Sequence, residues 1–277
     1  MTGTRAPSGV PFVKGHGTEN DFVLLPDPDG TLEVTVGQVR AICDRHAGLG
    51  ADGIIRVAPG PSGSDAAFVM DYRNADGSFA QMCGNGARVF ARFLVDEGWA
   101  APGRLWFSTC GGLRTADVPR TGDVTIGMGR VSVGTPSSAR IGDLEIVGVA
   151  VDVGNPHLAC LTDVDLAGID LSVPPSYSKA DFPEGVNIEI ISSTGTDQIR
   201  MRVHERGVGE TRSCGTGTVA AAAAYLQARN RSTGTVDVAV PGGAVIVTIT
   251  DEGSTLTGPA VIVASGTIDG AFWERHR

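Results

Sequence analysis

Two cysteines, Cys83 and Cys214, begin the same short pattern. Cys83 is followed by Gly-Asn-Gly and Cys214 by Gly-Thr-Gly, so glycine stands one and three residues after each cysteine. In both copies an aromatic–Leu pair ends the segment, ten residues after Cys83 at 93–94 and eleven residues after Cys214 at 225–226. The two cysteines are 131 residues apart, close to half of the chain. This pattern indicates an old duplication that produced two similar domains.

Each cysteine precedes an expected helix and lies at or next to its N-cap. The first backbone N–H groups of a helix lack partners within the helix, and the helix dipole is positive there, so both favour an anion. A cysteine in this position is more readily a thiolate. The neighbouring glycines let backbone N–H groups approach a bound carboxylate closely.

Two such thiols facing one cleft suit the inversion of a carbon that bears an acidic proton. One thiolate removes the proton from one face, and the other thiol donates a proton to the opposite face. The carbanion lies beside a carboxylate, where the helix N-termini would stabilise the growing charge. A single Cys-Gly at a helix start can be no more than a small residue at a tight turn, but its repetition favours chemistry. The same two thiols could also form an inactivating disulfide when the site is empty.

The surrounding elements predict an α+β fold. Two pseudo-symmetric domains are expected, each an antiparallel sheet or barrel wrapped around a central helix. The first central helix carries a polar stripe at Arg88, Arg92 and Asp96, the second is apolar over residues 219–224, and both should be enclosed. A further helix is expected at 36–45, and strands are expected at 22–25, 53–57, 67–73, 105–108, 124–128, 146–153, 186–192, 198–205, 236–240 and 244–250.

The domain boundary is expected in the Gly/Ser/Pro-rich stretch 130–139. The domains would then span residues 1–131 and 132–263, with 264–277 returning to the first domain.

Composition narrows the class of protein. A net charge of −9 over 277 residues argues against a general nucleic-acid binder. The first residues contain no apolar stretch of the secretory type, and the longest apolar run, 219–226, is too short to span a bilayer. A cytoplasmic protein without a membrane partner is therefore expected. The five cysteines include no CxxC pair, which disfavours a disulfide framework or a zinc site, and Cys43, Cys110 and Cys160 are expected to be buried hydrophobic residues.

The sequence around both cysteines resembles the diaminopimelate epimerase family. Residues 74–88 (NADGSFAQMCGNGAR) match the family pattern at its first catalytic cysteine, and residues 205–217 (ERGVGETRSCGTG) match the second. The resemblance continues at residues 17–22, 44–53, 154–157 and 185–187, so it covers nearly the whole chain. Some family members carry Gln where this chain has Gly53, so a side-chain contact is absent or replaced there.

The resemblance implies a homodimeric enzyme that interconverts LL- and meso-diaminopimelate on the route to lysine and peptidoglycan, with no pyridoxal phosphate or metal. It implies that Cys83 and Cys214 are the acid–base pair. The implied substrate-binding residues are Asn20, Asn74, Gly84, Asn85, Asn155, Asn187, Glu205, Arg206, Gly215 and Thr216.

Within this implied set, the backbone of Gly84-Asn85 and Gly215-Thr216 would hold the reacting carboxylate. Asn74, Asn187 and Arg206 would bind the distal carboxylate, Glu205 would hold the distal ammonium, and Asn20 and Asn155 would complete the pocket. An arginine fork matches a carboxylate in two parallel hydrogen bonds.

His157 has two possible roles, support of a cysteine's ionisation or simple packing. Glu205 or Glu210 could tune Cys214, and the motif favours Glu205.

Two alternatives stay open at this stage. A cofactor-independent racemase of the same fold, such as proline racemase, would share the cysteine motifs but needs no Glu-Arg pair for a second amino-acid head. A phosphate- or nucleotide-binding module is suggested by the Gly-rich run 207–217, but that run lacks the Lys-Ser/Thr of a P-loop.

Overall fold

The computed structural model describes residues 9–277, which form two compact units. The first unit combines the chain up to Val124 with Ala260–Arg277, and the second is Thr125–Pro259. Each unit consists mostly of strands and contains one long helix, so the α+β class is confirmed. The sequence predicts no secretory leader at the N-terminus. Residues 1–8, on which this prediction partly rests, lie outside the described residues.

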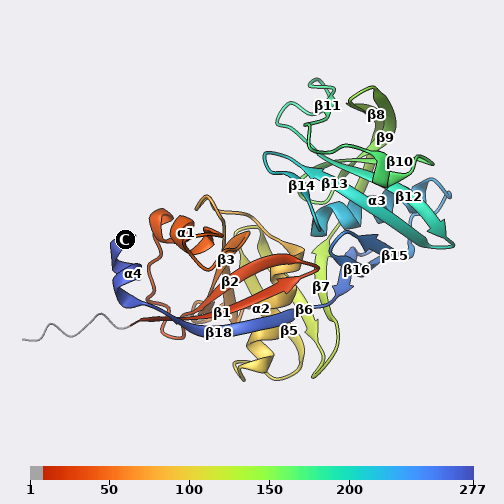
Figure 1. Ribbon diagram of the computed structural model, residues 1–277. Helices are drawn as coiled ribbons and strands as arrows, with labels where there is room; N and C mark the ends of the chain where they lie inside the picture. Colours follow the sequence, from red (N-terminus) through yellow and green to blue (C-terminus); the bar gives the residue numbers. More distant parts are fainter. Residues whose placement is uncertain (1–8) are drawn as a thin grey trace, which may run out of the picture. The chain divides into compact units, whose positions relative to one another are not determined.

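The elements of the first unit come from both ends of the chain (Figure 1). They are β1 (Val10–Gly17), β2 (Asn20–Pro26), α1 (Val36–Cys43), β3 (Gly53–Pro59), β4 (Phe68–Asn74), α2 (Gly84–Asp96), β5 (Gly103–Thr109), β6 (Gly112–Val118), β18 (Val261–Ile268) and α4 (Gly270–Arg275). Helix α1 ends two residues before the expected limit, because the Asp44 carboxylate accepts hydrogen bonds from the backbone N–H groups of His46 and Ala47 and turns the chain.

The second unit begins with the strand that starts at the boundary. Its elements are β7 (Val124–Gly129), β8 (Ser132–Ile141), β9 (Leu144–Asp152), β10 (Pro156–Leu161), the 3₁₀ turn η1 (Leu166–Gly168), β11 (Ser176–Tyr177), β12 (Asn187–Gly195), β13 (Gln198–Glu205), β14 (Gly209–Thr211), α3 (Gly215–Gln227), β15 (Gly234–Val240), β16 (Gly243–Ile249) and β17 (Ser254–Gly258).

The stretch 130–139, expected to link the domains, instead forms most of β8. Its proline is accommodated because the register with β9 shifts between Val133 and Pro136, and a bulge is a position where a strand tolerates proline.

Strand pairing follows the same order in both units. In the first, β18, β1, β2, β3, β4, β5 and β6 pair successively, and the β2–β3 and β4–β5 pairs are parallel while the others are antiparallel. In the second, β8, β9, β10, β12, β13, β15 and β16 repeat this order, with β10–β12 and β13–β15 parallel. The sheets are therefore mixed rather than purely antiparallel. The reason is that α1, α2 and α3 each lie in a crossover between two parallel strands.

Helices α2 and α3 are enclosed within their units, as their sequences predict. Helix α3 is buried from Thr218 to Leu226. In α2 two residues of the polar stripe, Arg88 and Arg92, are also buried and contact neighbouring loops, whereas the third, Asp96, is exposed. The Arg92 guanidinium donates to the carbonyl oxygens of Pro119 and Gly122, at 2.9 Å each. Among the described residues, every helix is too short or too polar to cross a membrane.

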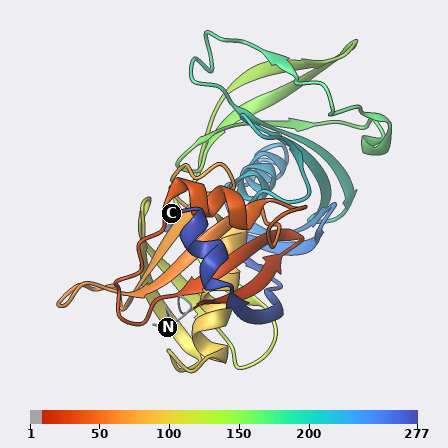
Figure 2. The same ribbon diagram turned by 60° about the vertical axis from the view of Figure 1, so that its left-hand side comes forward.

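The C-terminal segment completes the first unit. Strand β18 pairs with β1, from Val10 opposite Ile268 onwards. Asp269 is the N-cap of helix α4, and its carboxylate accepts hydrogen bonds from the backbone N–H groups of Ala271 and Phe272. Trp273 of α4 is buried in a cluster with residues of α1, and the Gln38 amide donates to the Trp273 carbonyl (3.2 Å). Figure 2 shows the blue α4 lying against the orange-red α1.

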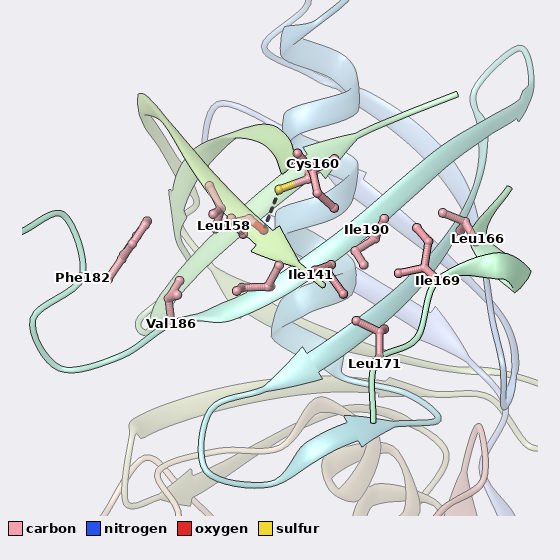
Figure 3. Packing of buried hydrophobic residues seen from close by; sticks show 12 residues of the cluster. Ile141, Leu158, Cys160, Leu166, Ile169, Leu171, Phe182, Val186 and Ile190 are labelled. Atoms are coloured by element: carbon pink, nitrogen blue, oxygen red, sulfur yellow. Dashed lines mark hydrogen bonds between the residues drawn. The ribbon is translucent and has the colours of Figure 1, made fainter. Parts of the chain in front are cut away.

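The second unit has a hydrophobic core to which Leu158, Cys160 and Ile190 contribute (Figure 3). Cys160 and Cys43 are buried, as expected, and burial raises the pKa of each thiol to about 12. The expectation for Cys110 is wrong. Cys110 is exposed because it lies in the turn between β5 and β6.

Substitution Trp273→Ala tests how far the C-terminal segment stabilises the first unit. Removing this buried ring should lower the free energy of unfolding by about 3–5 kcal/mol in urea denaturation. Trp106→Ala is the control, because Trp106 is 45% exposed and its loss should cost far less. Equal losses for the two variants would contradict the role given to this segment.

Candidate active site

Cys83 is the N-cap of α2. Its backbone is extended, with φ −132° and ψ 117°, and its Sγ accepts a hydrogen bond from the Gly86 N–H (3.4 Å). The thiol is half-buried. Gly84 and Asn85 form the first turn of the helix, where backbone N–H groups have no partner within the helix. A carboxylate at this point would be held by those N–H groups and by the positive end of the helix.

The tip of the β1–β2 hairpin lies over the start of α2. Its two turn residues, Thr18 and Glu19, have φ of 50° and 61°, the left-handed conformation that a tight two-residue hairpin requires. Gly17 permits this approach, since a Cβ there would lie 2.9 Å from the Asn85 carbonyl oxygen. The hairpin turn therefore lies in close contact with the first turn of α2.

Asn20 connects this hairpin to Cys83. Its side-chain N–H₂ donates to the Asp52 carboxylate (2.7 Å), which leaves its carbonyl oxygen for two donors. These donors are the Cys83 thiol (3.4 Å) and the Asn85 amide (3.2 Å). Asp52 therefore fixes the orientation of the Asn20 side chain toward the thiol.

A buried cation lies one turn further along α2. Arg88 is fully buried, and its guanidinium donates to the Thr18 hydroxyl (3.1 Å). Burial lowers its pKa to about 10, while the charges of Cys83 and Asp123 oppose that change. The guanidinium therefore stays protonated at neutral pH, and it favours negative charge at Cys83.

Cys214 is the N-cap of α3 and repeats the backbone of Cys83, with φ −124° and ψ 117°. Its surroundings differ. The thiol is buried, its Sγ lies 3.6 Å from the Thr216 hydroxyl, and Gly215 begins the helix. Burial, followed by the charges of Glu205 and Glu189, raises the pKa of this thiol well above its usual value. The environment of Cys214 therefore favours the neutral thiol.

Glu205 is the carboxylate that is hydrogen-bonded to Cys214. It accepts hydrogen bonds from the Cys214 thiol and from the Thr211 hydroxyl, while burial raises its pKa. Glu210, the other glutamate considered from the sequence, pairs instead with Arg202 (2.7 Å). Of the two glutamates, Glu205 is thus the one that acts on Cys214.

His157 is fully buried, and both of its ring nitrogens have partners. Nδ1 lies 2.7 Å from the Glu189 carboxylate, and Nε2 lies 3.0 Å from the Asn155 side-chain oxygen. Sequence reasoning missed Glu189. The signal was available, because an acidic residue inside the apolar run 186–191 is rare in a buried strand unless it is paired.

The residues expected to bind the distal carboxylate have contacts within their own units. Asn187 is buried and its side-chain oxygen accepts from the Arg206 backbone N–H (2.8 Å). The Arg206 guanidinium is exposed and donates to the Glu184 carbonyl (3.0 Å). In the first unit, Asn74 accepts from the Tyr72 hydroxyl (2.9 Å) and donates to Ser78 (3.0 Å).

The expected residues thus gather around the cysteine of their own unit to different degrees. In the first unit Asn20, Gly84 and Asn85 adjoin Cys83, while Asn74 has separate contacts on β4. In the second unit Glu205, Gly215 and Thr216 adjoin Cys214, and Asn155 with His157 and Asn187 with Arg206 form two further contacts.

The charge on Glu205 can be tested through the reactivity of Cys214. Glu205→Gln removes a negative charge beside the thiol, so the pKa of Cys214 should fall, and alkylation by iodoacetamide at pH 8 should be about threefold to tenfold faster. Mass spectrometry of the peptide that contains Cys214 measures this rate. Glu210→Gln is the matched control and should leave the rate unchanged. A slower or equal rate in Glu205→Gln would contradict the assignment.

Comparison with known proteins identifies the family. The profile of the diaminopimelate epimerase family matches residues 12–134 and 149–263. The chain is 50% identical over 287 aligned positions to the diaminopimelate epimerase of Mycobacterium ulcerans (strain Agy99), with 96% of this chain and 99% of that protein covered. It is 46% identical over 281 positions to that of Streptomyces coelicolor (strain A3(2)), covering 96% and 97%.

Solved structures share the fold at low sequence identity. A hydroxyproline epimerase from Agrobacterium vitis superposes with a TM-score of 0.68 at 16% identity, covering 96% of this chain and 98% of that one. A PhzF-family phenazine biosynthesis protein from Bacillus anthracis gives a TM-score of 0.65 at 16% identity, covering 94% and 98%. The fold is thus shared with proteins of other families, whereas the sequence matches the diaminopimelate epimerase family. The chain belongs to the diaminopimelate epimerase family and is an isomerase.

Proposed function

We propose that this chain interconverts LL- and meso-diaminopimelate, with Cys83 and Cys214 as the acid–base pair. The observation that carries this proposal is the repeated N-cap cysteine. In each unit a cysteine with nearly the same backbone conformation caps an enclosed helix. Membership of the family and the identities of 46–50% to relatives of that name support the substrate.

The reaction divides between the two thiols. The α-carbon loses its proton to a thiolate on one face and receives a proton from a thiol on the opposite face, and the roles exchange in the reverse direction. Cys214 suits the resting acid, because burial and two nearby carboxylates favour its protonated form. Cys83 suits the resting base, because the Gly86 N–H and the buried Arg88 cation favour negative sulfur, although its ionisation gives up the hydrogen bond that the thiol donates to the Asn20 oxygen.

The reacting carboxylate would bind at the helix N-termini. Backbone N–H groups of Gly84-Asn85 and Gly215-Thr216 are donors fixed by the helices. Charge that builds on the carboxylate oxygens after proton loss would meet these donors without further rearrangement. The proposed chemistry uses no pyridoxal phosphate and no metal, because the two thiols supply both proton transfers and the helix N–H donors would stabilise the negative charge.

The far end of the substrate would meet Asn74, Asn187 and Arg206 at its carboxylate. Arg206 is exposed, and one of its five N–H donors is used by the Glu184 carbonyl, so others are available to a ligand. Glu205 would hold the distal ammonium, since a carboxylate offers about four acceptor positions and can serve Thr211, Cys214 and a ligand. Asn20 and Asn155 would complete the pocket.

The cellular setting follows from this activity. The product would feed lysine and peptidoglycan precursor synthesis, and the enzyme would be a cytoplasmic homodimer whose partner is a small molecule rather than nucleic acid or membrane. Equilibrium sedimentation tests the dimer.

The two-thiol mechanism is tested by solvent isotope incorporation. With LL-diaminopimelate in deuterium oxide, the wild-type chain should form meso product carrying deuterium at the inverted carbon. Cys83→Ala and Cys214→Ala should each lower this rate about 10²- to 10⁴-fold, since each removes one acid–base group. Cys110→Ala, in the exposed β5–β6 turn, is the control and should stay within twofold of wild type. Full activity in either site variant would exclude that cysteine from the chemistry.

A substitution of Arg206 tests whether the enzyme requires a substrate with a second α-amino-acid group. Arg206→Leu should raise KM for diaminopimelate about 10- to 100-fold through loss of a charged hydrogen bond. Arg200→Leu, an exposed arginine on β13, should leave KM unchanged. Proline and hydroxyproline should exchange no α-proton with wild type, and rapid exchange of either would favour a one-headed substrate instead.

A further inference from the structure

Glu189 is a buried carboxylate that the proposed reaction does not use. It lies on β12, has no exposed surface, and is flanked by Ile188 and Ile190, which belong to the core of the second unit (Figure 3). Of the described side chains, only that of His157 forms a hydrogen bond to it. Burying a charged or polar group in this way is costly unless its partner is well placed, so the pair requires an explanation.

The contact leaves His157 with a defined arrangement of protons. One proton lies between Nδ1 and the Glu189 carboxylate, whichever of the two groups holds it. On the other side of the ring, the Asn155 carbonyl oxygen accepts from Nε2, so Nε2 carries a hydrogen. Neither nitrogen is left to accept a proton from a cysteine or a substrate. The histidine is therefore a connector between Glu189 and Asn155 rather than a base.

Asn155 lies at a pocket, so the orientation of its side-chain amide decides whether it presents a donor or an acceptor there. It is half-buried, and the pocket that it lines has a volume of about 330 Å³. Asp152 and Asp181 also line this pocket, and their carboxylates accept hydrogen bonds from the Gly154 N–H (2.7 Å) and the Ser137 hydroxyl (2.7 Å). Because the Asn155 oxygen is bonded to the histidine, its N–H₂ group points away from the ring and is available as a donor. A carboxylate ligand needs donors, and a side chain free to flip would present an oxygen half of the time.

The same carboxylate also lies close to Cys214. Gly217 is in the first turn of α3, and a Cβ at this position would be 2.6 Å from the Glu189 Oε1 and 3.3 Å from the Cys214 Sγ. Both atoms thus border the space that the missing side chain leaves open. Glu189 is therefore connected to the site in two directions, toward Asn155 through His157 and directly toward Cys214.

We propose that Glu189 is a positioning residue, which fixes the ring of His157 and through it presents the Asn155 N–H₂ group to a carboxylate of the substrate. This rests on the proposed function for the identity of the ligand. The arrangement of Glu189, His157 and Asn155 itself is independent of it.

The first experiment measures the histidine ring in the folded, ligand-free protein. In ¹⁵N-histidine-labelled protein, the His157 signals should show a hydrogen on Nε2 and a strongly downfield proton at Nδ1. A ring whose Nε2 carries no hydrogen would overturn the proposal, because Asn155 would then present its oxygen to the pocket. This measurement requires no variant to fold and no substrate.

The second experiment compares two variants at one position. Glu189→Gln keeps a hydrogen-bond partner for Nδ1 and should preserve KM, whereas Glu189→Leu removes the partner and should raise KM about threefold to tenfold, the value of one neutral hydrogen bond. Both remove the same charge near Cys214, so kcat should change equally in the two. Equal KM values for folded Gln and Leu variants would overturn the proposal.

The third experiment repeats the comparison in an Asn155→Ala background. If Glu189 acts through Asn155, the KM difference between the Gln and Leu variants should vanish there, whereas a purely structural role would leave it unchanged. Absence of epimerisation by wild type would reject the proposed function. Normal epimerisation together with an unprotonated Nε2 would reject only the role of Glu189.

Discussion

The structure depends on two helix N-termini that are enclosed by strands and capped by cysteine. A helix end exposes several unpaired N–H groups, and enclosing it is costly unless partners are supplied. At α2 one such partner is the Cys83 sulfur, which accepts from the Gly86 N–H, and at α3 the Cys214 sulfur lies beside the Thr216 hydroxyl. The enclosure of α2 and α3 thus buries apolar surface in each unit and keeps each cysteine at a helix N-terminus.

The two units share one strand order, but the electrostatic environments of their two cysteines differ. Cys83 adjoins a neutral amide and lies near a buried guanidinium, whereas Cys214 adjoins Glu205 and lies near Glu189. The backbone at the two cysteines is nearly identical, so side chains on neighbouring strands account for the difference. A duplicated scaffold supplies two equivalent positions, and the side chains around them give the two thiols different electrostatic environments.

Much of the fold could be predicted from pattern alone. The two central helices and several strands, such as β3 with its largely apolar sequence and β13 with its alternation of apolar and polar residues, lie where the sequence places them. Strand β8 was missed because its Gly, Ser and Pro residues imitate a linker, and only pairing with β9 makes it a strand. The parallel pairs were missed for a related reason, since the direction of pairing depends on partners distant in the sequence.

The sequence by itself was sufficient to identify the internal duplication, the two candidate catalytic cysteines and the family, because these depend on residue types at short, fixed spacings. Only the tertiary structure decided what surrounds each thiol. Glu189 and His157 are 32 residues apart, and their contact exists because β10 and β12 are parallel neighbours. The electrostatic state of a buried group depends on such neighbours and on exclusion of water, and neither property is local in the chain.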